Sequence, residues 1–264
     1  KGLGQNFLIN PTVCPRMAEE GGAAPGVGVI EIGAGIGVLT AELAQRAEKV
    51  LCIEIDSRLL PVLDETLAEF SNVEIVNADV MEVDLQALLA EKFPGMEVVV
   101  CANLPYYITS PILMRLLESR LPVTGITVMV QKEAAIRLCA RPGTRECGAV
   151  SLAVQYYAEA ETLFSVSRGS FLPAPNVDSA VIRLTVRKTP PCAVRNEALL
   201  FRLIRSAFGQ RRKTLPNALV TAGCSKAAVQ AALRAASISE TARAEELTLP
   251  QFAALADALD GPAA

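Results

Sequence analysis

The segment that decides the fold reads VGVIEIGAGIGVLT over residues 27–40. It begins as an apolar run typical of a buried parallel strand, continues through a glycine-rich turn, and takes up a helical pattern near Gly37. Gly33, Gly35 and Gly37 can adopt backbone conformations closed to other residues, and they let a ligand approach the main chain. A dinucleotide site spaces its glycines G-x-G-x-x-G, but the third such position here is Val38. The turn therefore favours a different nucleoside.

Acidic residues lie at or just after the carboxyl ends of the next two apolar strands, at the same edge of the expected sheet. Glu54 lies in the strand predicted at 50–55, where a carboxylate can accept hydrogen bonds from both ribose hydroxyls. Asp79 follows the strand predicted at 73–77 and fits a contact to an adenine amino group. We assign the residues after these acids, Ile55 and Val80, to the same site. This order favours an S-adenosylmethionine site over a nicotinamide site or a sheet without a ligand.

The fourth apolar strand ends in Asn103-Leu104-Pro105-Tyr106. The side-chain oxygen of Asn103 and the backbone carbonyl of Leu104 can accept two N–H bonds from a planar exocyclic amine. The ring of Tyr106 can stack on the attached base. Pro105 fixes its own φ at about −65° and has no N–H, which stiffens the turn. Such a tetrapeptide also occurs as an ordinary loop, so its interpretation depends on the glycine turn upstream.

The alternation of strands and helices up to about residue 140 predicts a parallel sheet covered on both faces. We expect strands near 27–32, 50–55, 73–77, 98–102 and 125–130, and helices near 37–47, 58–70, 84–92, 110–119 and 131–140. Two further strands, at 149–157 and 177–187, form a hairpin-like pair in this prediction. The expected fold class is α/β, with a Rossmann-like seven-stranded mixed sheet.

A helical pattern follows Thr189-Pro190-Pro191, with stretches near 196–208, 212–221, 226–236 and 249–259. We place the domain boundary at this proline pair. The prediction is a catalytic domain over residues 1–189 and a small all-helical C-terminal domain over residues 190–264.

Charge differs between the two predicted parts of the chain. Residues 1–187 carry 15 Lys+Arg against 22 Asp+Glu, whereas residues 188–264 carry 10 against 6. A basic small domain beside an acidic one indicates a phosphate-rich partner that is gripped outside the chemical site. A solvated helix face is the alternative. We favour nucleic acid and assign its binding to Arg202, Arg205, Arg211, Arg212 and Lys213.

Composition excludes several kinds of site. The chain has no histidine, which removes Ser-His-Asp and Cys-His catalysis and histidine-ligated zinc, and we expect no metal. Its seven cysteines form no C-x-x-C pair, which indicates reduced core residues in a cytoplasmic protein. No stretch approaches the ~20 apolar residues of a membrane span, and the N-terminus lacks a signal-peptide pattern. We expect a monomer, and a leading segment before Lys1.

One further loop, GSFLPAPNVDS at residues 169–179, contains two prolines two positions apart. They stiffen the loop and would present Phe171 on a fixed support. A base splayed out of an RNA stack could then sit between Tyr106 and Phe171, with each ring contributing ~1–3 kcal/mol. Core packing is the alternative role for Phe171.

Five ordered motifs make the chain resemble the ribosomal RNA adenine dimethyltransferase family, in its KsgA-type branch. They are GQNFL at 4–8, EIGAGIG at 31–37, NLPY at 103–106, the F-x-P-x-P loop at 171–175 and FGQRRKTL at 208–215. The resemblance spans essentially the whole chain.

This resemblance implies a class I methyltransferase that uses S-adenosylmethionine. Its implied reaction is dimethylation of N6 of two adjacent adenosines near the 3′ end of small-subunit (16S) rRNA, in the immature small ribosomal subunit. The family's cofactor contacts fall on Asn6, Leu8, Gly33, Glu54, Asp79 and Asn103, and we assign Gln5, beside Asn6, to the same site. Pro216 departs from the family's pattern, and we expect a shortened or kinked helix there.

Three alternatives remain open at this stage. A sister family methylates an adenosine of large-subunit rRNA, confers macrolide resistance and has nearly the same motifs. A methyltransferase for protein glutamine amides also presents an Asn-x-Pro-Tyr loop, but it needs neither the basic tail nor Phe171. The third is a non-enzymatic ribosome-assembly or transcription factor that keeps the fold as an RNA-binding platform.

Overall fold

The computed structural model describes residues 6–261, and the chain divides into two compact units. Of the described residues, the first unit contains 6–135 and 158–186, and the second contains 136–157 and 187–261. The later division falls at Val186, close to the predicted proline boundary. Residues 136–157, which we expected in the catalytic domain, group with the helical unit instead.

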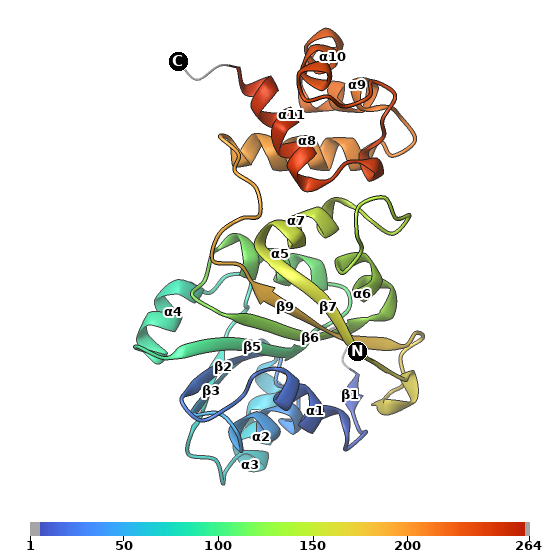
Figure 1. Cartoon of the computed structure of the whole chain (residues 1–264). Helices are drawn as coiled ribbons and strands as arrows, with labels where there is room; N and C mark the ends of the chain where they lie inside the picture. The colour runs from blue at the N-terminus through green and yellow to red at the C-terminus, as the bar shows by residue number, and fades with distance from the viewer. Residues whose placement is uncertain (1–5, 262–264) are drawn as a thin grey trace. The chain divides into compact units, whose positions relative to one another are not determined.

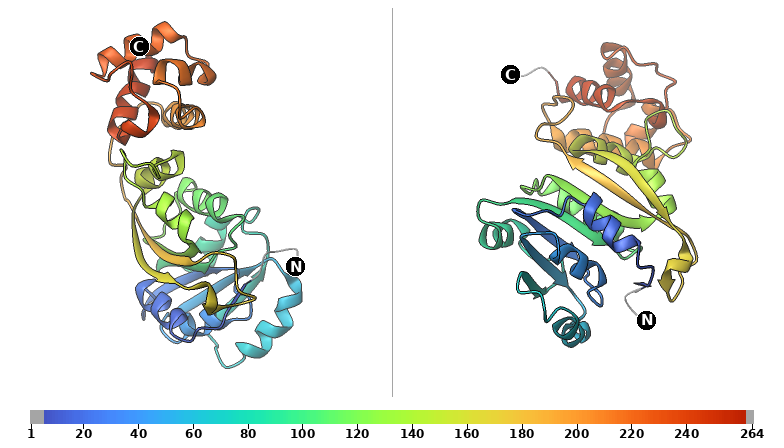
Figure 2. Two further views of the ribbon diagram at one scale, coloured as in Figure 1. Left: turned by 90° about the vertical axis from the view of Figure 1, so that its right-hand side faces the viewer. Right: turned by 60° about the horizontal axis from the view of Figure 1, so that its bottom comes forward.

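The first unit is built on a seven-stranded sheet in the order β4-β3-β2-β5-β6-β9-β7 (Figure 1). The first five strands of this order pair in parallel, whereas β9 pairs antiparallel with both β6 and β7, so β9 alone runs against the other six strands of this sheet. β9 and β7 run side by side in Figure 2. The strands are β2 (Val27–Ile32), β3 (Lys49–Glu54), β4 (Val73–Asn77), β5 (Glu97–Asn103), β6 (Gly125–Gln131), β7 (Ala158–Val166) and β9 (Ser179–Val186). Chain order reverses at β2, which lies between β3 and β5, and ligands bind at such switch points in open α/β sheets.

Helices cover both faces of this sheet. In Figure 1, α1, α2 and α3 lie on one face, while α4 and α5 lie on the other. The helices of this part of the chain are α1 (Val13–Glu20), α2 (Val38–Ala44), α3 (Leu60–Thr66), α4 (Leu85–Lys92), α5 (Thr109–Glu118) and α6 (Lys132–Leu138). Met17, Leu43 and Val50 belong to the buried cluster between α1, α2 and the sheet, which fixes those helices against the strands.

A separate two-stranded antiparallel sheet joins distant parts of the chain. It pairs β1 (Phe7–Leu8) with β8 (Phe171–Leu172), with Leu8 opposite Phe171. The Ile9 N–H donates to the Ser170 carbonyl at 2.8 Å, and the Asn10 side chain donates to the Ser170 hydroxyl at 3.1 Å. The N-terminal motif is therefore held against the Phe171 loop.

The strand predicted at 149–157 is wrong. This segment forms α7 (Ala149–Tyr157), and the strand that pairs with β9 is the following β7. Most side chains of α7 are buried, so its sequence shows almost no polar face from which a helical period could be recognised. The predicted number of strands in the main sheet, seven, is confirmed, but one of these strands is predicted a full element too early, and the short strands β1 and β8 are not predicted.

The second unit is helical. Besides α7 it contains α8 (Glu197–Gly209), α9 (Leu215–Ala218), α10 (Lys226–Ala235) and α11 (Leu249–Asp260). The hydroxyls of Tyr156 and Tyr157 donate to the carboxylate of Glu197 at 3.0 and 2.8 Å, and the Tyr157 ring stacks on Phe201. These contacts between α7 and α8 explain why residues 136–157 group with the C-terminal helices.

The shortened helix expected at Pro216 is confirmed. The helix predicted from residue 212 begins only at Leu215, because Pro216 is tolerated in the first turn of a helix but not within it. After four residues it changes to a 3-10 turn at Leu219–Ala222. None of the described helices is long and apolar enough to cross a membrane.

Gly28 on β2 lies against the ring of Phe93, which follows α4, and this contact leads to a prediction. A Cβ added at Gly28 would lie 2.3 Å from a ring carbon of Phe93, whose side chain is buried. We therefore expect Gly28→Ala to lower the free energy of unfolding by about 1–3 kcal/mol, measured by denaturant unfolding. Gly125→Ala, on β6, is the matched control, because a Cβ added there would lie 4.0 Å from its nearest neighbour, the Leu184 carbonyl oxygen. Equal losses for the two variants would contradict this account.

Candidate active site

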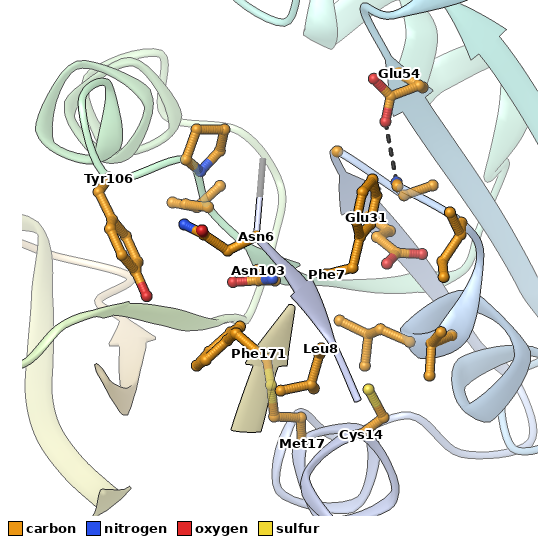
Figure 3. Close-up of a pocket in the computed structure, with 18 of the residues that line it drawn as sticks. Asn6, Phe7, Leu8, Cys14, Met17, Glu31, Glu54, Asn103, Tyr106 and Phe171 are labelled. Carbon is orange, nitrogen blue, oxygen red and sulfur yellow. Dashed lines mark hydrogen bonds between the residues drawn. The ribbon is translucent and has the colours of Figure 1, made fainter. Parts of the chain in front are cut away.

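A cavity opens at the carboxyl ends of β2, β3 and β5, at the switch point of the sheet (Figure 3). Its walls come from the N-terminal motif, the glycine turn, the end of β3, the loop after β5, and β8. The lining residues include Asn6, Phe7, Leu8, Cys14, Met17, Glu31, Gly33, Ala34, Gly35, Ile36, Glu54, Ile55, Asn103, Leu104, Pro105, Tyr106, Tyr107 and Phe171. Four of the five sequence motifs therefore meet in one cavity of the first unit.

The backbone conformation of the turn after β2 explains why it contains three glycines. Gly33, Gly35 and Gly37 have φ of 76°, 61° and 87°, a region that side-chain-bearing residues rarely adopt. Gly33 and Gly35 line the cavity, whereas Gly37 does not. A Cβ at Gly37 would lie 3.0 Å from the Thr66 hydroxyl, so this glycine lets α2 approach α3 closely.

Glu54 is held in place by two backbone amides. The Gly35 N–H donates to one carboxylate oxygen at 3.1 Å, drawn in Figure 3, and the Asp56 N–H donates to the other at 2.8 Å. The Glu54 side chain is buried, yet it lines the cavity. Because each carboxylate oxygen can accept more than one hydrogen bond, Glu54 can also bind ligand hydroxyls.

Hydrogen bonds in the loop after β5 occupy the Pro105 carbonyl and the Leu104 N–H. The Pro105 carbonyl accepts bonds from the Ile108 N–H at 3.2 Å and the Thr109 hydroxyl at 3.1 Å. The Leu104 N–H donates to the Met129 carbonyl, while the Leu104 carbonyl accepts no hydrogen bond from any described residue. A free carbonyl therefore lies next to the Asn103 side chain, which points into the cavity in Figure 3.

Tyr106 and Phe171 both line the cavity, with different exposure. The Tyr106 hydroxyl lies 2.6 Å from the buried Ser179 hydroxyl, which fixes its half-buried ring. Burial raises the pKa of Tyr106, so the phenol stays neutral at ordinary pH. Phe171 is only 3% exposed and belongs to the same core cluster as Leu8. It therefore packs in the core and forms part of the cavity wall.

Glu31 is a site residue that the sequence analysis missed. It lies in β2, is 1% exposed, and lines the cavity, with the Cys52 thiol 3.5 Å from its carboxylate. Burial raises the pKa of Glu31 to about 7, against hydrogen bonds from Thr40 and Cys52 that lower it, and the charge of Glu54 raises it further. An acidic residue inside an otherwise apolar strand was the available signal.

Other assigned residues lie elsewhere. Asp79 and Val80 follow β4 but do not line the cavity, and an Asp79 oxygen accepts the Met81 N–H at 2.8 Å. Gln5 falls outside the described residues. The five basic residues are all exposed on the second unit: Arg202, Arg205, Arg211, Arg212 and Lys213. No group of three or more metal-ligating side chains occurs among the residues that the structure describes.

Comparison with known proteins agrees with the motifs. The family model described as ribosomal RNA adenine dimethylase matches residues 1–260. The chain belongs to this family. The resemblance noted from five sequence motifs is thus confirmed for the ribosomal RNA adenine dimethylases as a whole.

Individual relatives of this dimethylase chain are similar over nearly its full length. "Ribosomal RNA small subunit methyltransferase A" of Geobacillus sp. (strain WCH70) is 48% identical, covering 98% of this chain and 91% of the relative. The protein of the same name from Geobacillus thermodenitrificans is 49% identical, covering 98% and 90%. The chain is therefore an rRNA-modifying methyltransferase by family.

Solved structures confirm the predicted class I methyltransferase fold of this dimethylase. A 23S rRNA methyltransferase, ErmE, has a TM-score of 0.72 at 29% identity and covers 97% of this chain and 100% of its own. A dimethyladenosine transferase from Plasmodium falciparum has a TM-score of 0.78 at 25% identity, with 94% and 95% covered.

Glu31 makes the stability of the dimethylase depend on pH. Its pKa is about 7 in the folded chain against an ordinary 4.5, so the folded state binds more protons than the unfolded state between these values. The stabilisation is complete below about pH 4.5 and is lost as the pH rises through about 7. We expect the free energy of unfolding of the wild-type protein without ligand to fall over this pH range by up to about 3 kcal/mol more than that of Glu31→Gln.

Urea unfolding at several pH values measures this difference. The exposed Glu65→Gln variant is the control and should follow the wild type. If the free energy of unfolding changes with pH equally for wild type and Glu31→Gln, the buried Glu31 carboxyl does not lose its proton over this range.

Proposed function

We propose that this dimethylase transfers methyl groups from S-adenosylmethionine to N6 of two adjacent adenosines near the 3′ end of small-subunit rRNA, in the immature small subunit. The observation that carries the proposal is the free Leu104 carbonyl beside Asn103, in the same cavity as the glycine turn and Glu54. The relatives named small subunit methyltransferase A, at 48% and 49% identity, support the choice of subunit.

The residues of the cavity fit an S-adenosylmethionine molecule. Glu54, oriented by two backbone amides, would accept the ribose hydroxyls, and the glycine turn would let the ligand lie against the main chain. The buried carboxyl of Glu31 would face the ammonium group of the methionine part. Ile55, half exposed at the rim, would cover the adenine. When bound, this cofactor supplies an electron-poor methyl carbon on a sulfonium.

The chain's own residues would prepare the target amine. Adenine N6 is conjugated with its ring, so its lone pair is a poor nucleophile. Hydrogen bonds to the Asn103 oxygen and the Leu104 carbonyl favour a more tetrahedral nitrogen and direct its lone pair toward the methyl group. Tyr106 would stack on the base, and the buried Phe171 would form part of the cavity wall that the base meets. No general base is needed, because the proton can leave after transfer, and this suits a chain without histidine.

Asn103→Ala tests the cradle. Since one of two acceptors is lost, we expect single-turnover methyl transfer to fall about 100-fold, with cofactor affinity by calorimetry changed less than about 5-fold. Asn103→Asp keeps an acceptor oxygen at the same place and should retain more activity than the alanine variant. Transfer at the wild-type rate by Asn103→Ala would remove this residue from the mechanism.

The choice of substrate is tested with purified ribosomal subunits that lack the modification. We expect label from methyl-labelled S-adenosylmethionine to enter small subunits, and mass mapping to locate two adjacent dimethyladenosines. Label in large subunits would support the macrolide-resistance activity instead. Intact cofactor binding with label in neither subunit would favour a non-enzymatic RNA-binding platform.

A further inference from the structure

The loop between α6 and α7 is tied to the C-terminal helices by backbone contacts. The Gly143 N–H donates to the carbonyl of Glu245 at 2.8 Å, and the Arg211 guanidinium donates to the carbonyl of Arg145 at 2.8 Å. The Thr144 hydroxyl donates to the Arg141 carbonyl at 2.7 Å, and Cys147 is fully buried. The loop is therefore part of the second unit, although Arg145 precedes Arg211 by 66 residues in sequence.

The Arg211 side chain is hydrogen-bonded to this loop. One of its amino groups bonds to the Arg145 carbonyl, and its guanidinium carbon lies 5.9 Å from the centre of the Phe208 ring. Both contacts fix the direction of the side chain. Arg211 therefore supports the loop, and its guanidinium is not wholly available to an outside partner.

The side chains of Arg141 and Arg145 are exposed, and no described carboxylate lies within ion-pair distance of them. Exposed Arg234 on the same unit is different, because it pairs with Glu240 at 2.5 Å. The loop itself, residues 139–148, contains one acid, Glu146.

We infer that residues 141–145 form a second phosphate-binding element of the helical unit, in which Arg141 and Arg145 contact the RNA backbone and Arg211 holds the loop in place. An unpaired guanidinium presents a planar set of donors that matches phosphate oxygens. The bond from Arg211 to the Arg145 carbonyl brings this loop next to the segment that contains Arg212 and Lys213, and Arg141 lies four residues before Arg145 in the same loop. Such contacts add affinity without reading sequence. The inference rests on the proposed RNA substrate.

The test uses the whole chain and two probes, unmodified small ribosomal subunits and a labelled RNA duplex. We expect Arg141→Ala/Arg145→Ala to weaken binding about 5- to 10-fold at low salt and to reduce the slope of log affinity against log salt by about 1–2. The KM for subunits should rise while kcat and S-adenosylmethionine affinity stay unchanged. Arg234→Ala, the matched control, should bind like the wild type.

The supporting role of Arg211 has a separate readout. The loop carries a trypsin site after Arg145, and Arg211→Ala should speed cleavage there several-fold, whereas Arg212→Ala should not. Unchanged RNA affinity and salt slope in the folded double variant would overturn the phosphate-binding element alone. If the wild type itself binds neither subunits nor duplex, the proposed function fails together with this inference.

Discussion

The site depends on one interaction, the binding of the Glu54 carboxylate by the backbone amides of Gly35 and Asp56. Gly35 can point its N–H toward Glu54 because its φ is positive, and this explains a glycine at that position. The same bonds join the turn after β2 to the end of β3. The two loops that would flank a nucleoside are therefore fixed relative to one another before any ligand enters, which reduces the entropy lost on binding.

Rigidity of this kind suits the chemistry proposed for the chain. Methyl transfer to a conjugated amine needs alignment more than acid–base catalysis, and alignment comes from groups that do not move. The carbonyl of Leu104 is free because the carbonyl of Pro105 takes the helix-capping donors. Tyr106 is fixed through Ser179 on β9. The groups to which we assign the chemistry are thus main-chain atoms and neutral side chains at the end of a stiff sheet.

Local sequence patterns predicted most of the architecture because they act at short range. The glycine turn, the strands with acids at their ends and the short helix at Pro216 all follow from backbone chemistry that neighbouring residues determine. Segment 149–157 could not be assigned in this way, since a helix buried nearly all round has no polar face to reveal its period. The Arg211 contact to Arg145 joins residues that meet only after folding, so no local pattern marks it. Glu31 carried a local signal, an acid within an apolar strand, but its burial in the cavity wall is set by residues from elsewhere in the chain.

The pairing of β1 with β8 has a consequence for synthesis of the protein. Residues 7–8 form one wall of the cavity only when they lie against residues 171–172, which a ribosome makes some 160 residues later. A nascent chain therefore carries the glycine turn and Asn103 well before it can enclose them. The cavity wall is therefore complete only after the strand that contains Phe171 has been made.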